Sequence, residues 1–366
     1  MKVPLVDLRA SFQPIKDELF REFEGILDSM ELFLGPNVQA FEQEFSQFCE
    51  VEHGIGVSSG TDALVVALRS LGIGHGDEVI VPSLTFFASI EAIVHTGAVP
   101  VMVDVDPDIL TIDPVRIAEA ITPSTRAIVP VHLYGHPADM DPILALAAKH
   151  GLRVVEDCAQ AHGARYRGRR CGSMGDASAF SFYFTKNLGA YGEAGFVTTP
   201  HQDVAKRVRE YRHHGQVSKF EHARMGYNLR LDELQAAVLR LKLRRLEENN
   251  RRRVAIANCY DHLLAETGIR SLMPRPDSEP VYHLYPIRLE DRDALRSSLE
   301  AKGIGTGVHY KIPGHCQPAL EGHTHRVGDM AVTEETCRSV LSIPMFPELT
   351  DEQVNYVTAQ IRDGPA

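Results

Sequence analysis

Long apolar runs are absent from the sequence, which contains no stretch approaching about 18 consecutive hydrophobic residues. A helix that spans a bilayer needs about 20 such residues, so we expect no transmembrane segment. Residues 1–20 become polar too early for a secretory signal, and we therefore expect a cytoplasmic protein. The six cysteines are scattered without a CxxC pair. Such spacing is typical of reduced thiols and argues against a disulfide framework or a zinc site.

Positive charge is also scarce, with 38 Lys and Arg residues against 49 Asp and Glu residues and a net charge of −11. Nucleic-acid binding needs clustered cations that neutralise phosphates, so we expect no nucleic-acid partner. The arginine-rich stretch 240–253 includes two glutamates within a helical pattern, and we interpret it as a solvated helix face. The 17 histidines include neither HExxH nor a paired-ligand spacing, so we assign no metal site.

The fold class follows from the alternation of short Val- and Ile-rich runs with amphipathic helical stretches between residues 54 and 199. Continuous apolar runs of this kind are typical of strands buried on both faces. We therefore predict an α/β fold, with a large domain whose mostly parallel sheet is covered by helices. Ligands of such sheets bind at the carboxyl ends of the strands, where we look for functional groups.

The remainder of the chain predicts a second, smaller domain. Residues 231–267 contain neither Gly nor Pro and predict one long helix or two. Strands expected over 281–288 and 305–310 flank a helix, which indicates a small α+β domain. We place the large domain, with its N-terminal helical segment, at 1–245 and the small C-terminal domain at 246–366.

A glycine-rich loop between the apolar runs 177–183 and 195–199 contains one lysine, Lys186, among small, aromatic and hydroxylic residues. An amine held by apolar walls loses hydration, and its pKa falls because burial disfavours the charged form. The uncharged amine is a nucleophile that can form a Schiff base with an aldehyde. The alternative is a loop lysine whose amine extends into solvent, and this stretch alone favours neither interpretation.

A turn and two strand ends supply further candidate groups. Ser59–Thr61 opens an apolar helix, where free backbone N–H groups can bind a phosphate, although a simple helix cap is equally consistent. Asp157 ends a strand, where an acid is either a helix cap or a partner for a protonated ring nitrogen. Phe86 follows another strand and offers a flat aromatic face. Together with Lys186, these groups fit pyridoxal 5′-phosphate (PLP).

Motifs along nearly the whole chain match one family of enzymes. They are FLGP at 33–36, SGTDAL at 59–64, GDEVIVPS at 76–83, PVHLYGHPADMD at 130–141, VEDCAQAHGA at 155–164, SFYFTKNLGAYGEAG at 181–195, GYNLRLDELQAA at 226–237, GVHY at 307–310 and LSIPMFP at 341–347. With these motifs the sequence resembles the DegT-type sugar aminotransferases, which are PLP enzymes of fold type I. Phe184 stands where many members have Pro, and Glu193 and Ala194 stand where they have Asp and Gly. These differences leave the functional groups in place and bear on substrate choice.

The resemblance implies that Lys186 is the catalytic residue and holds PLP as a Schiff base. The other implied roles are a partner for the ring nitrogen at Asp157, a side chain near the ring at Gln160, a stacked aromatic at Phe86, phosphate ligands at Gly60, Thr61 and Ser181, a ligand for the neighbouring subunit's phosphate at Asn228, and sugar-lining residues at His309 and Tyr310. For His309, a packed core histidine is a nearly equal alternative.

The resemblance further implies a homodimer with shared active sites, and an amino group that moves from L-glutamate to a keto group of a nucleotide-linked sugar. Residues 212–237 look most like members that act on dTDP-linked 3-keto-6-deoxyhexoses. A UDP-linked sugar with its keto group at carbon 3 or 4 is the alternative. A PLP-bound regulatory protein without activity would have no need of Lys186, Asp157 and Gln160 together. An amino-acid transaminase needs an arginine for the substrate carboxylate, and the spacing singles none out.

Overall fold

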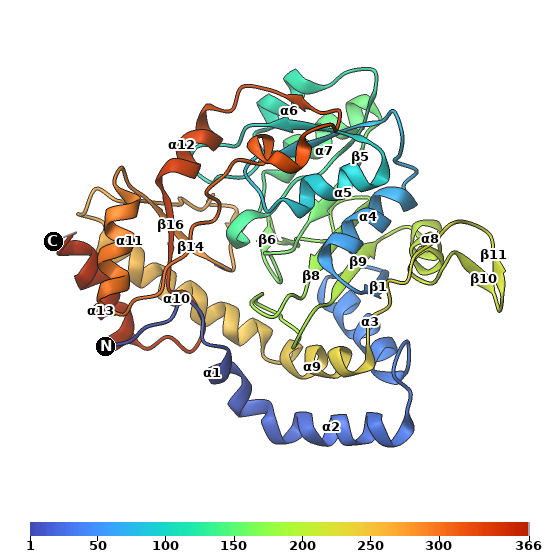
Figure 1. Ribbon diagram of the computed structural model, residues 1–366, viewed down its shortest axis with the longest axis horizontal. Coiled ribbons are helices and arrows are strands. Elements are labelled where there is room, and N and C mark those ends of the chain that lie inside the picture. The colour runs from blue at the N-terminus through green and yellow to red at the C-terminus, as the bar shows by residue number, and fades with distance from the viewer. Residues whose placement is uncertain (365–366) are drawn as a thin grey trace.

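The computed structural model describes residues 1–364, and its centre is a sheet of eight strands in the order β1-β9-β8-β5-β4-β2-β3-β15 (Figure 1). The strands are β1 (His53–Val57), β2 (Glu78–Pro82), β3 (Val99–Val103), β4 (Thr125–Ile128), β5 (Arg153–Asp157), β8 (Ala177–Ser181), β9 (Gly195–Thr199) and β15 (Arg326–Val327). Neighbouring strands run parallel, except that β9 is antiparallel to both β1 and β8. The prediction of a mostly parallel sheet is confirmed.

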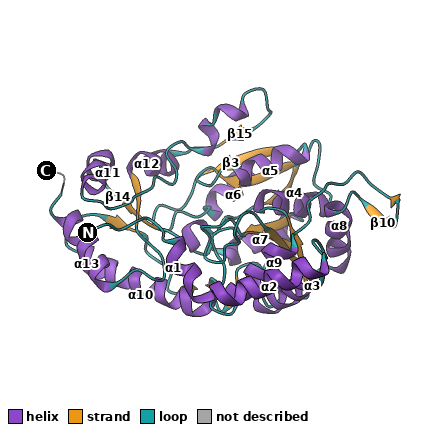
Figure 2. Ribbon diagram, turned by 60° about the horizontal axis from the view of Figure 1, so that its bottom comes forward, coloured by secondary structure: helices purple, strands orange, loops and turns teal. Residues whose placement is uncertain are grey.

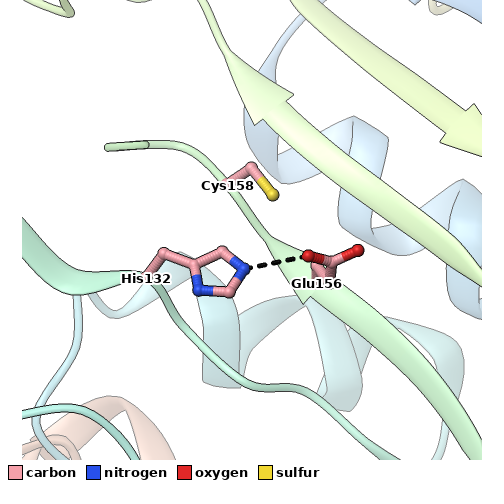
Figure 3. A group of neighbouring side chains, drawn as sticks. All are labelled: His132, Glu156 and Cys158. Carbon is pink, nitrogen blue, oxygen red and sulfur yellow. Dashed lines mark hydrogen bonds and ion pairs between the residues drawn. The ribbon is translucent and has the colours of Figure 1, made fainter. Parts of the chain in front are cut away.

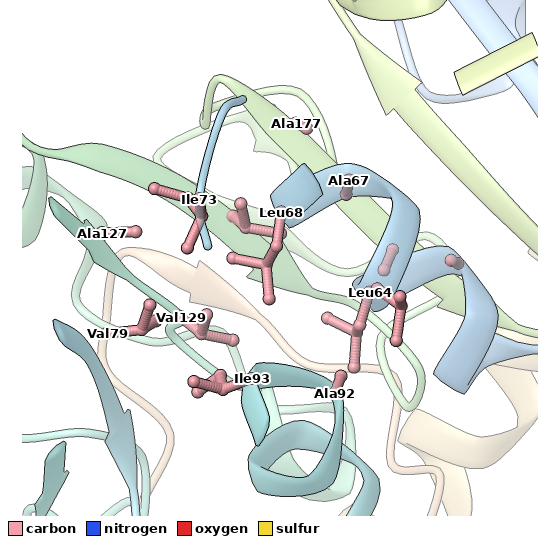
Figure 4. Close-up of a cluster of buried hydrophobic side chains, with 14 of the residues drawn as sticks. Leu64, Ala67, Leu68, Ile73, Val79, Ala92, Ile93, Ala127, Val129 and Ala177 are labelled. Atoms are coloured by element: carbon pink, nitrogen blue, oxygen red, sulfur yellow. The ribbon is translucent and has the colours of Figure 1, made fainter. Parts of the chain in front are cut away.

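Helices cover both faces of this sheet, as the continuous apolar strands require. On one face lie α4 (Gly60–Ser70), α5 (Ala88–Thr96) and α8 (Gln202–Arg212), and on the other lie α3 (Pro36–Phe48), α6 (Pro114–Ala120), α7 (Met140–His150) and α9 (Glu233–Leu243). Alternate residues of β2 point to opposite faces, so Val79 packs under α4 and α5 while Ile80 packs toward α6 and α7. Figure 4 shows Leu64 and Leu68 of α4 against Val79, Val129 and Ile93.

The C-terminal part has its own three-stranded antiparallel sheet in the order β12-β14-β16. Its elements are α10 (Leu246–Leu264), β12 (Arg270–Ser271), β14 (Tyr285–Arg288), α11 (Arg292–Ala301), α12 (Ala331–Ser339), β16 (Val340–Ile343) and α13 (Asp351–Arg362). The expected strand over 305–310 is wrong, because Gly307 forms only an isolated bridge with Ser342. The N-terminal residues pair with the start of this segment, where Gly305 donates its N–H to the Val3 carbonyl oxygen at 2.8 Å.

The stretch 231–267 forms two helices, α9 and α10, rather than one. The domain division at 245/246 falls between them and stays a prediction. One short strand from the second part, β15, pairs with β3 of the large sheet, and Leu320 and Met330 pack in the large core. Part of 246–366 therefore lies against the large sheet.

The remaining elements lie outside the eight-stranded sheet. They are α1 (Leu8–Phe12), α2 (Lys16–Ser29), β6 (Arg165–Tyr166), β7 (Arg169–Arg170), β10 (Gln216–Ser218), β11 (Glu221–His222), β13 (Ser278–Glu279) and four single-turn 3-10 helices at 13–15, 133–135, 314–316 and 318–320. The β10–β11 hairpin projects from the body beside α8 (Figures 1 and 2). Within residues 1–364, every helix is too short or too polar to cross a bilayer.

Candidate active site

A cavity of about 520 Å³ opens at the carboxyl ends of the central strands, between the large sheet and the C-terminal part. All of the predicted site residues except Asn228 line it, namely Gly60, Thr61, Phe86, Asp157, Gln160, Ser181, Lys186, His309 and Tyr310. These residues come from segments that are far apart in the sequence, and the sheet brings them together because parallel strands end at a common edge.

Lys186 lies in the loop between β8 and β9, where its backbone N–H donates to the Tyr183 carbonyl oxygen at 2.8 Å. Its side chain is half-buried and lines the cavity, so the interpretation of a solvent-extended lysine does not apply. Burial lowers the pKa of its amine to about 8, against the opposing effects of the Asp157 and Glu193 carboxylates. More of this amine than of an ordinary lysine is therefore uncharged near neutral pH, and the uncharged form can act as a nucleophile or base.

The pKa of Lys186 predicts how fast the apoprotein captures PLP at different pH values. Only the uncharged amine attacks an aldehyde, so the capture rate should rise with pH and level off above about 8. Asp157→Asn removes a negative charge that raises this pKa, so the midpoint of the profile should move to lower pH. Stopped-flow absorbance on both sides of pH 8 measures the profile. A rate independent of pH, or a midpoint that Asp157→Asn moves upward, would contradict this assignment.

Asp157 is the last residue of β5 and is buried. Its Oδ2 accepts a hydrogen bond from the Ser89 hydroxyl at 2.7 Å, and its Oδ1 accepts one from the Ala159 N–H at 3.1 Å. Ser89 in turn lies 2.8 Å from the Thr85 hydroxyl. A buried carboxylate fixed in this way is a suitable partner for a cationic ring nitrogen.

The N-terminus of α4 forms the end of the cavity that suits an anion. The helix begins at Gly60, and the Ser59 hydroxyl caps the Asp62 N–H at 3.1 Å, while the first backbone N–H groups of a helix have no intrahelical partner. A Cβ at Gly60 would lie 2.5 Å from the Ser181 Cβ, and one at Gly195 would lie 2.0 Å from the Ser59 carbonyl oxygen. Glycine at both positions lets the turn approach the strand ends closely.

Phe86 follows β2 on the way to α5, and the residue is 58% exposed although it lines the cavity. The ring centroid lies 6.0 Å from that of Tyr310, with the ring planes inclined by 44°. A large aromatic face left open inside a cavity is available for stacking on a flat ring.

The exposed face of Phe86 predicts a graded response to substitution. Phe86→Tyr keeps the π-face and should retain PLP as the parent does, whereas Phe86→Ala should weaken PLP binding about three- to tenfold, the usual worth of one aromatic contact. Equilibrium dialysis of PLP measures the difference. Phe87→Ala is the control, because Phe87 packs against the core under α4 instead. Equal retention of PLP by Phe86→Ala and the parent would show that Phe86 has no stacking role.

The C-terminal part contributes His309 and Tyr310 to the opposite wall. Gln160 donates from its Nε2 to the Tyr310 phenol oxygen at 3.1 Å. The Nδ1 atom of His309 lies 3.0 Å from the Ser342 hydroxyl, and burial and the nearby Lys186 lower its pKa to about 4. His309 is therefore neutral near pH 7 and faces the cavity as a polar, uncharged group.

Asn228 lies outside the cavity of its own chain. It is exposed and forms an antiparallel bridge with His213 at the base of the β10–β11 hairpin. Its predicted role thus requires a second subunit.

Several lining residues were missed by the sequence reasoning. Leu5 and Val6 reach the cavity from the N-terminal segment, and His283 enters from the loop before β14. Burial lowers the pKa of His283 well below its usual value, and its Nδ1 lies 3.3 Å from the Asn187 Oδ1. Ser89, the donor to Asp157, lies 68 residues before it. No local pattern marks these positions as functional, although His283 lies within the stretch 281–288 that the sequence predicts to be a strand.

A second polar cluster, buried beneath the sheet, comprises His132, Glu156 and Cys158 (Figure 3). The His132 Nε2 lies 3.0 Å from Glu156, while its Nδ1 accepts the Ala138 N–H at 3.0 Å. Further donors to the Glu156 carboxylate are the N–H groups of Gly172, Met174 and Gly175 and the hydroxyl of Ser178. Both side chains are thus saturated by the protein itself, which makes the cluster a structural network rather than a metal centre.

Residues 13–362 match the DegT/DnrJ/EryC1/StrS aminotransferase family. The chain belongs to this family. The aminotransferase is 48% identical to the dTDP-3-amino-3,4,6-trideoxy-alpha-D-glucose transaminase of Streptomyces venezuelae, over 99% of this chain and 96% of the relative. It is 46% identical to the UDP-N-acetyl-3-dehydro-alpha-D-glucosamine 3-aminotransferase of Acidithiobacillus ferrooxidans, over 98% and 97% of the two chains.

A solved structure extends the likeness to three dimensions. DesV of S. venezuelae, crystallised with a ketimine intermediate, superposes with a TM-score of 0.96 at 49% identity and covers 99% of this chain and 98% of its own. The fold is therefore that of the fold type I aminotransferases. The cofactor of this aminotransferase is PLP, and solved relatives carry it in its aldehyde and amine forms.

The residues of this chain fit that cofactor. The cavity combines a half-buried amine of lowered pKa, a buried carboxylate, a helix N-terminus and an open aromatic face. The helix end suits a phosphate, the carboxylate a ring nitrogen and the amine an aldehyde. The two glycine contacts beside Ser59 and Ser181 leave no room for a side chain in the anion cradle.

Proposed function

We propose that this aminotransferase moves the amino group of L-glutamate to the 3-keto group of a dTDP-linked 6-deoxyhexose. The observation that carries the proposal is that Lys186 and Asp157 line one cavity, large enough for a sugar beside a cofactor. The 48% identity to a transaminase named for a dTDP-linked 3-amino sugar supports the choice of nucleotide and carbon. The proposed site residues are Lys186, Asp157, Gln160, Phe86, Gly60, Thr61, Ser181, His309 and Tyr310, with Asn228 from a second subunit.

The roles of the chain's own groups follow from their chemistry. When bound, PLP supplies an electron-withdrawing ring that stabilises negative charge on the substrate carbon next to nitrogen. Lys186 is the general base. Its uncharged amine takes the proton from that carbon, and in the second half of the reaction it delivers a proton to the sugar carbon that receives the amino group. Asp157 holds its negative charge against the ring nitrogen, and the α4 N-terminus holds the phosphate. His309 and Tyr310 orient the sugar without adding charge.

A UDP-linked keto sugar is the second candidate, because a relative of 46% identity is named for a UDP-linked 3-dehydro sugar. The test is amine transfer from L-glutamate to a panel of dTDP- and UDP-linked sugars with the keto group at carbon 3 or carbon 4. We expect the dTDP-linked 3-keto sugar to have the highest kcat/KM. A UDP-linked sugar with a higher value would overturn the choice of nucleotide. No reaction with glutamate alone, seen as an unchanged cofactor spectrum, would favour the non-catalytic regulatory alternative.

We also propose that two copies form a homodimer with shared active sites. Asn228 is exposed and lies outside its own cavity, bridged to His213 at the base of the β10–β11 hairpin. This hairpin projects from the body of the molecule (Figure 1). The segment around that hairpin leaves Phe220 83% and Met225 91% exposed, and α2 leaves Phe20 57% exposed. Large apolar side chains in this number are typical of surfaces that a partner covers. An isologous dimer would bring Asn228 of one protomer to the anion cradle of the other, reciprocally.

The shared-site model predicts complementation between two inactive variants. Lys186→Ala removes the base of one site, and Asn228→Asp places a negative charge beside the phosphate of the other, so each homodimer should be nearly inactive. In a heterodimer of the two, one site receives both defects and the other receives neither. Co-refolded and separated heterodimers should regain about one parental site per dimer. Heterodimers as inactive as both parents would show that Asn228 does not act across an interface.

A cytoplasmic location fits the cysteine chemistry. All six cysteines are free, and Cys49, Cys158, Cys171 and Cys337 are buried. Free thiols are maintained in reducing compartments, which supports this proposal.

A further inference from the structure

Tyr134 lies behind the cavity wall, where two separate parts of the site meet. Its side chain is fully buried (0% exposed), and its φ of +58° is a left-handed conformation that residues other than glycine seldom adopt. Such conformations persist where the surroundings hold them, and they cluster at functional sites. Gly135 continues the turn, and a Cβ there would lie 2.9 Å from the backbone nitrogens of Tyr282 and His283. The turn is thus packed backbone against backbone.

Two hydrogen bonds connect Tyr134 to opposite walls of the cavity. Its backbone N–H donates to the Gln160 Oε1 at 2.6 Å, on the side of the large sheet. Its phenol donates to the His309 carbonyl oxygen, in the C-terminal part. Burial raises the pKa of the Tyr134 phenol well above its usual value, so the phenol stays protonated and remains a donor. One residue therefore fixes both Gln160 and the segment that carries His309 and Tyr310.

The direction of these bonds determines what the Tyr310 phenol can do. A backbone N–H only donates, so the Gln160 Oε1 must be the acceptor and its amide nitrogen must face Tyr310. That nitrogen donates to the phenol oxygen at 3.1 Å, which leaves the phenol proton for another acceptor. Burial raises the pKa of Tyr310, so the proton is retained, and the side chain lines the cavity.

We propose that Tyr134 is a positioning residue: its backbone N–H, through Gln160, makes the Tyr310 phenol a hydrogen-bond donor to an oxygen of the bound sugar, and its own phenol holds the segment that carries Tyr310. The proposal rests on the proposed function, which supplies the sugar. In the hydrogen bond between the Tyr310 phenol and the sugar, the protein donates and the sugar oxygen accepts. The ring oxygen of a sugar accepts only, so this arrangement favours a sugar that places its ring oxygen opposite Tyr310.

The first test removes only the phenol of Tyr134. The probe is dTDP-3-amino-3,4,6-trideoxy-α-D-glucose, titrated calorimetrically into the amine form of the holoenzyme. Tyr134→Phe should raise its Kd about fivefold, the worth of one hydrogen bond that positions the site. The loss in the glutamate half-reaction, followed by cofactor absorbance, should be much smaller. Tyr356→Phe is the matched control, because its phenol also donates to a backbone carbonyl, that of Lys302, away from the cavity.

The second test reverses the direction of the bonds. In Gln160→Glu both carboxylate oxygens accept, so the Tyr310 phenol must donate to Glu and no longer to the sugar. Tyr310→Phe should therefore raise the Kd about tenfold in the parent and scarcely at all in the Gln160→Glu background. Equal costs of Tyr310→Phe in both backgrounds would overturn the assigned direction.

The outcomes separate this inference from the function on which it rests. A parent that binds the probe while Tyr134→Phe binds it equally well refutes the positioning role of the Tyr134 phenol and leaves the proposed function intact. A variant that loses the glutamate half-reaction in the same proportion as sugar binding also refutes it, because that pattern marks a general structural defect. A parent that binds neither this probe nor its UDP-linked counterpart overturns the proposed function and the inference together.

Discussion

Lys186→Ala should lower the rate of transamination by about 10³-fold or more, because the reaction loses its general base and its covalent attachment point together. The fold should survive, since the substitution removes a half-buried amine whose charged form burial already disfavours. The measurement is steady-state transfer from L-glutamate, with thermal unfolding as the check on folding. Borohydride reduction of the parent, followed by peptide mapping, should locate the cofactor on Lys186.

Lys242 offers a matched control for this experiment. Burial lowers its amine pKa to about 8 as well, yet that amine donates to the Gly189 carbonyl oxygen and lies over the Tyr191 ring, outside the main cavity. Lys242→Met should therefore keep most of the transaminase activity, and borohydride should fix as much cofactor onto this variant as onto the parent. Full activity in Lys186→Ala, or borohydride labelling of Lys242 in the parent, would end the assignment of Lys186.

Asp157→Asn should have the next largest effect and slow proton transfer by about 10²- to 10³-fold, the usual cost of removing one preorganised electrostatic partner. Asparagine has the same size and keeps an acceptor for the Ser89 hydroxyl, but it has no charge to hold the ring nitrogen protonated. The cofactor should still bind, because the phosphate cradle and Phe86 are untouched. The measurement is the single-turnover rate with glutamate, compared with the Kd of glutamate.

Asp104→Asn separates a loss of chemistry from a loss of stability. Asp104 is also a buried acid just beyond a strand of the large sheet, but it accepts from Val332 and Thr333 at the start of α12. This substitution should lower the melting temperature and leave the proton-transfer rate nearly unchanged. If Asp157→Asn changed only the affinity for glutamate and not the chemical step, the role of ring partner would be wrong.

Much of the architecture could be predicted because it depends on local patterns. The Val- and Ile-rich runs between residues 54 and 199 are buried on both faces, and this burial demands a helix-covered parallel sheet. Because β2, β5 and β8 run parallel, their carboxyl ends lie at one edge of the sheet. Phe86, Asp157 and Lys186 follow or end these strands and must therefore lie near one another. The sequence does not decide between one helix and two over 231–267, because the absence of Gly and Pro permits a continuous helix without requiring one.

The expected strand over 305–310 was wrong for a tertiary reason. Its alternating residues suit a strand, but a strand needs a free partner along its whole edge. Val3 pairs only with the start of this segment, at Gly303 and Gly305, and farther along only Gly307 pairs with Ser342. The segment is then free to bring His309 and Tyr310 into the cavity.

The sequence alone determined the family, the α/β fold, the cofactor and the chemical groups that handle it, because each is carried by contiguous motifs. Only the tertiary structure decided how those groups are held and oriented. Ser89 reaches Asp157 across 68 residues, and the Tyr134 phenol reaches His309 across 175. Hydrogen bonds over such separations leave no periodic trace in the chain, because their geometry depends on how the sheet and the C-terminal part pack together. The lowered pKa of Lys186 likewise arises from burial, which exists only once the cavity has formed.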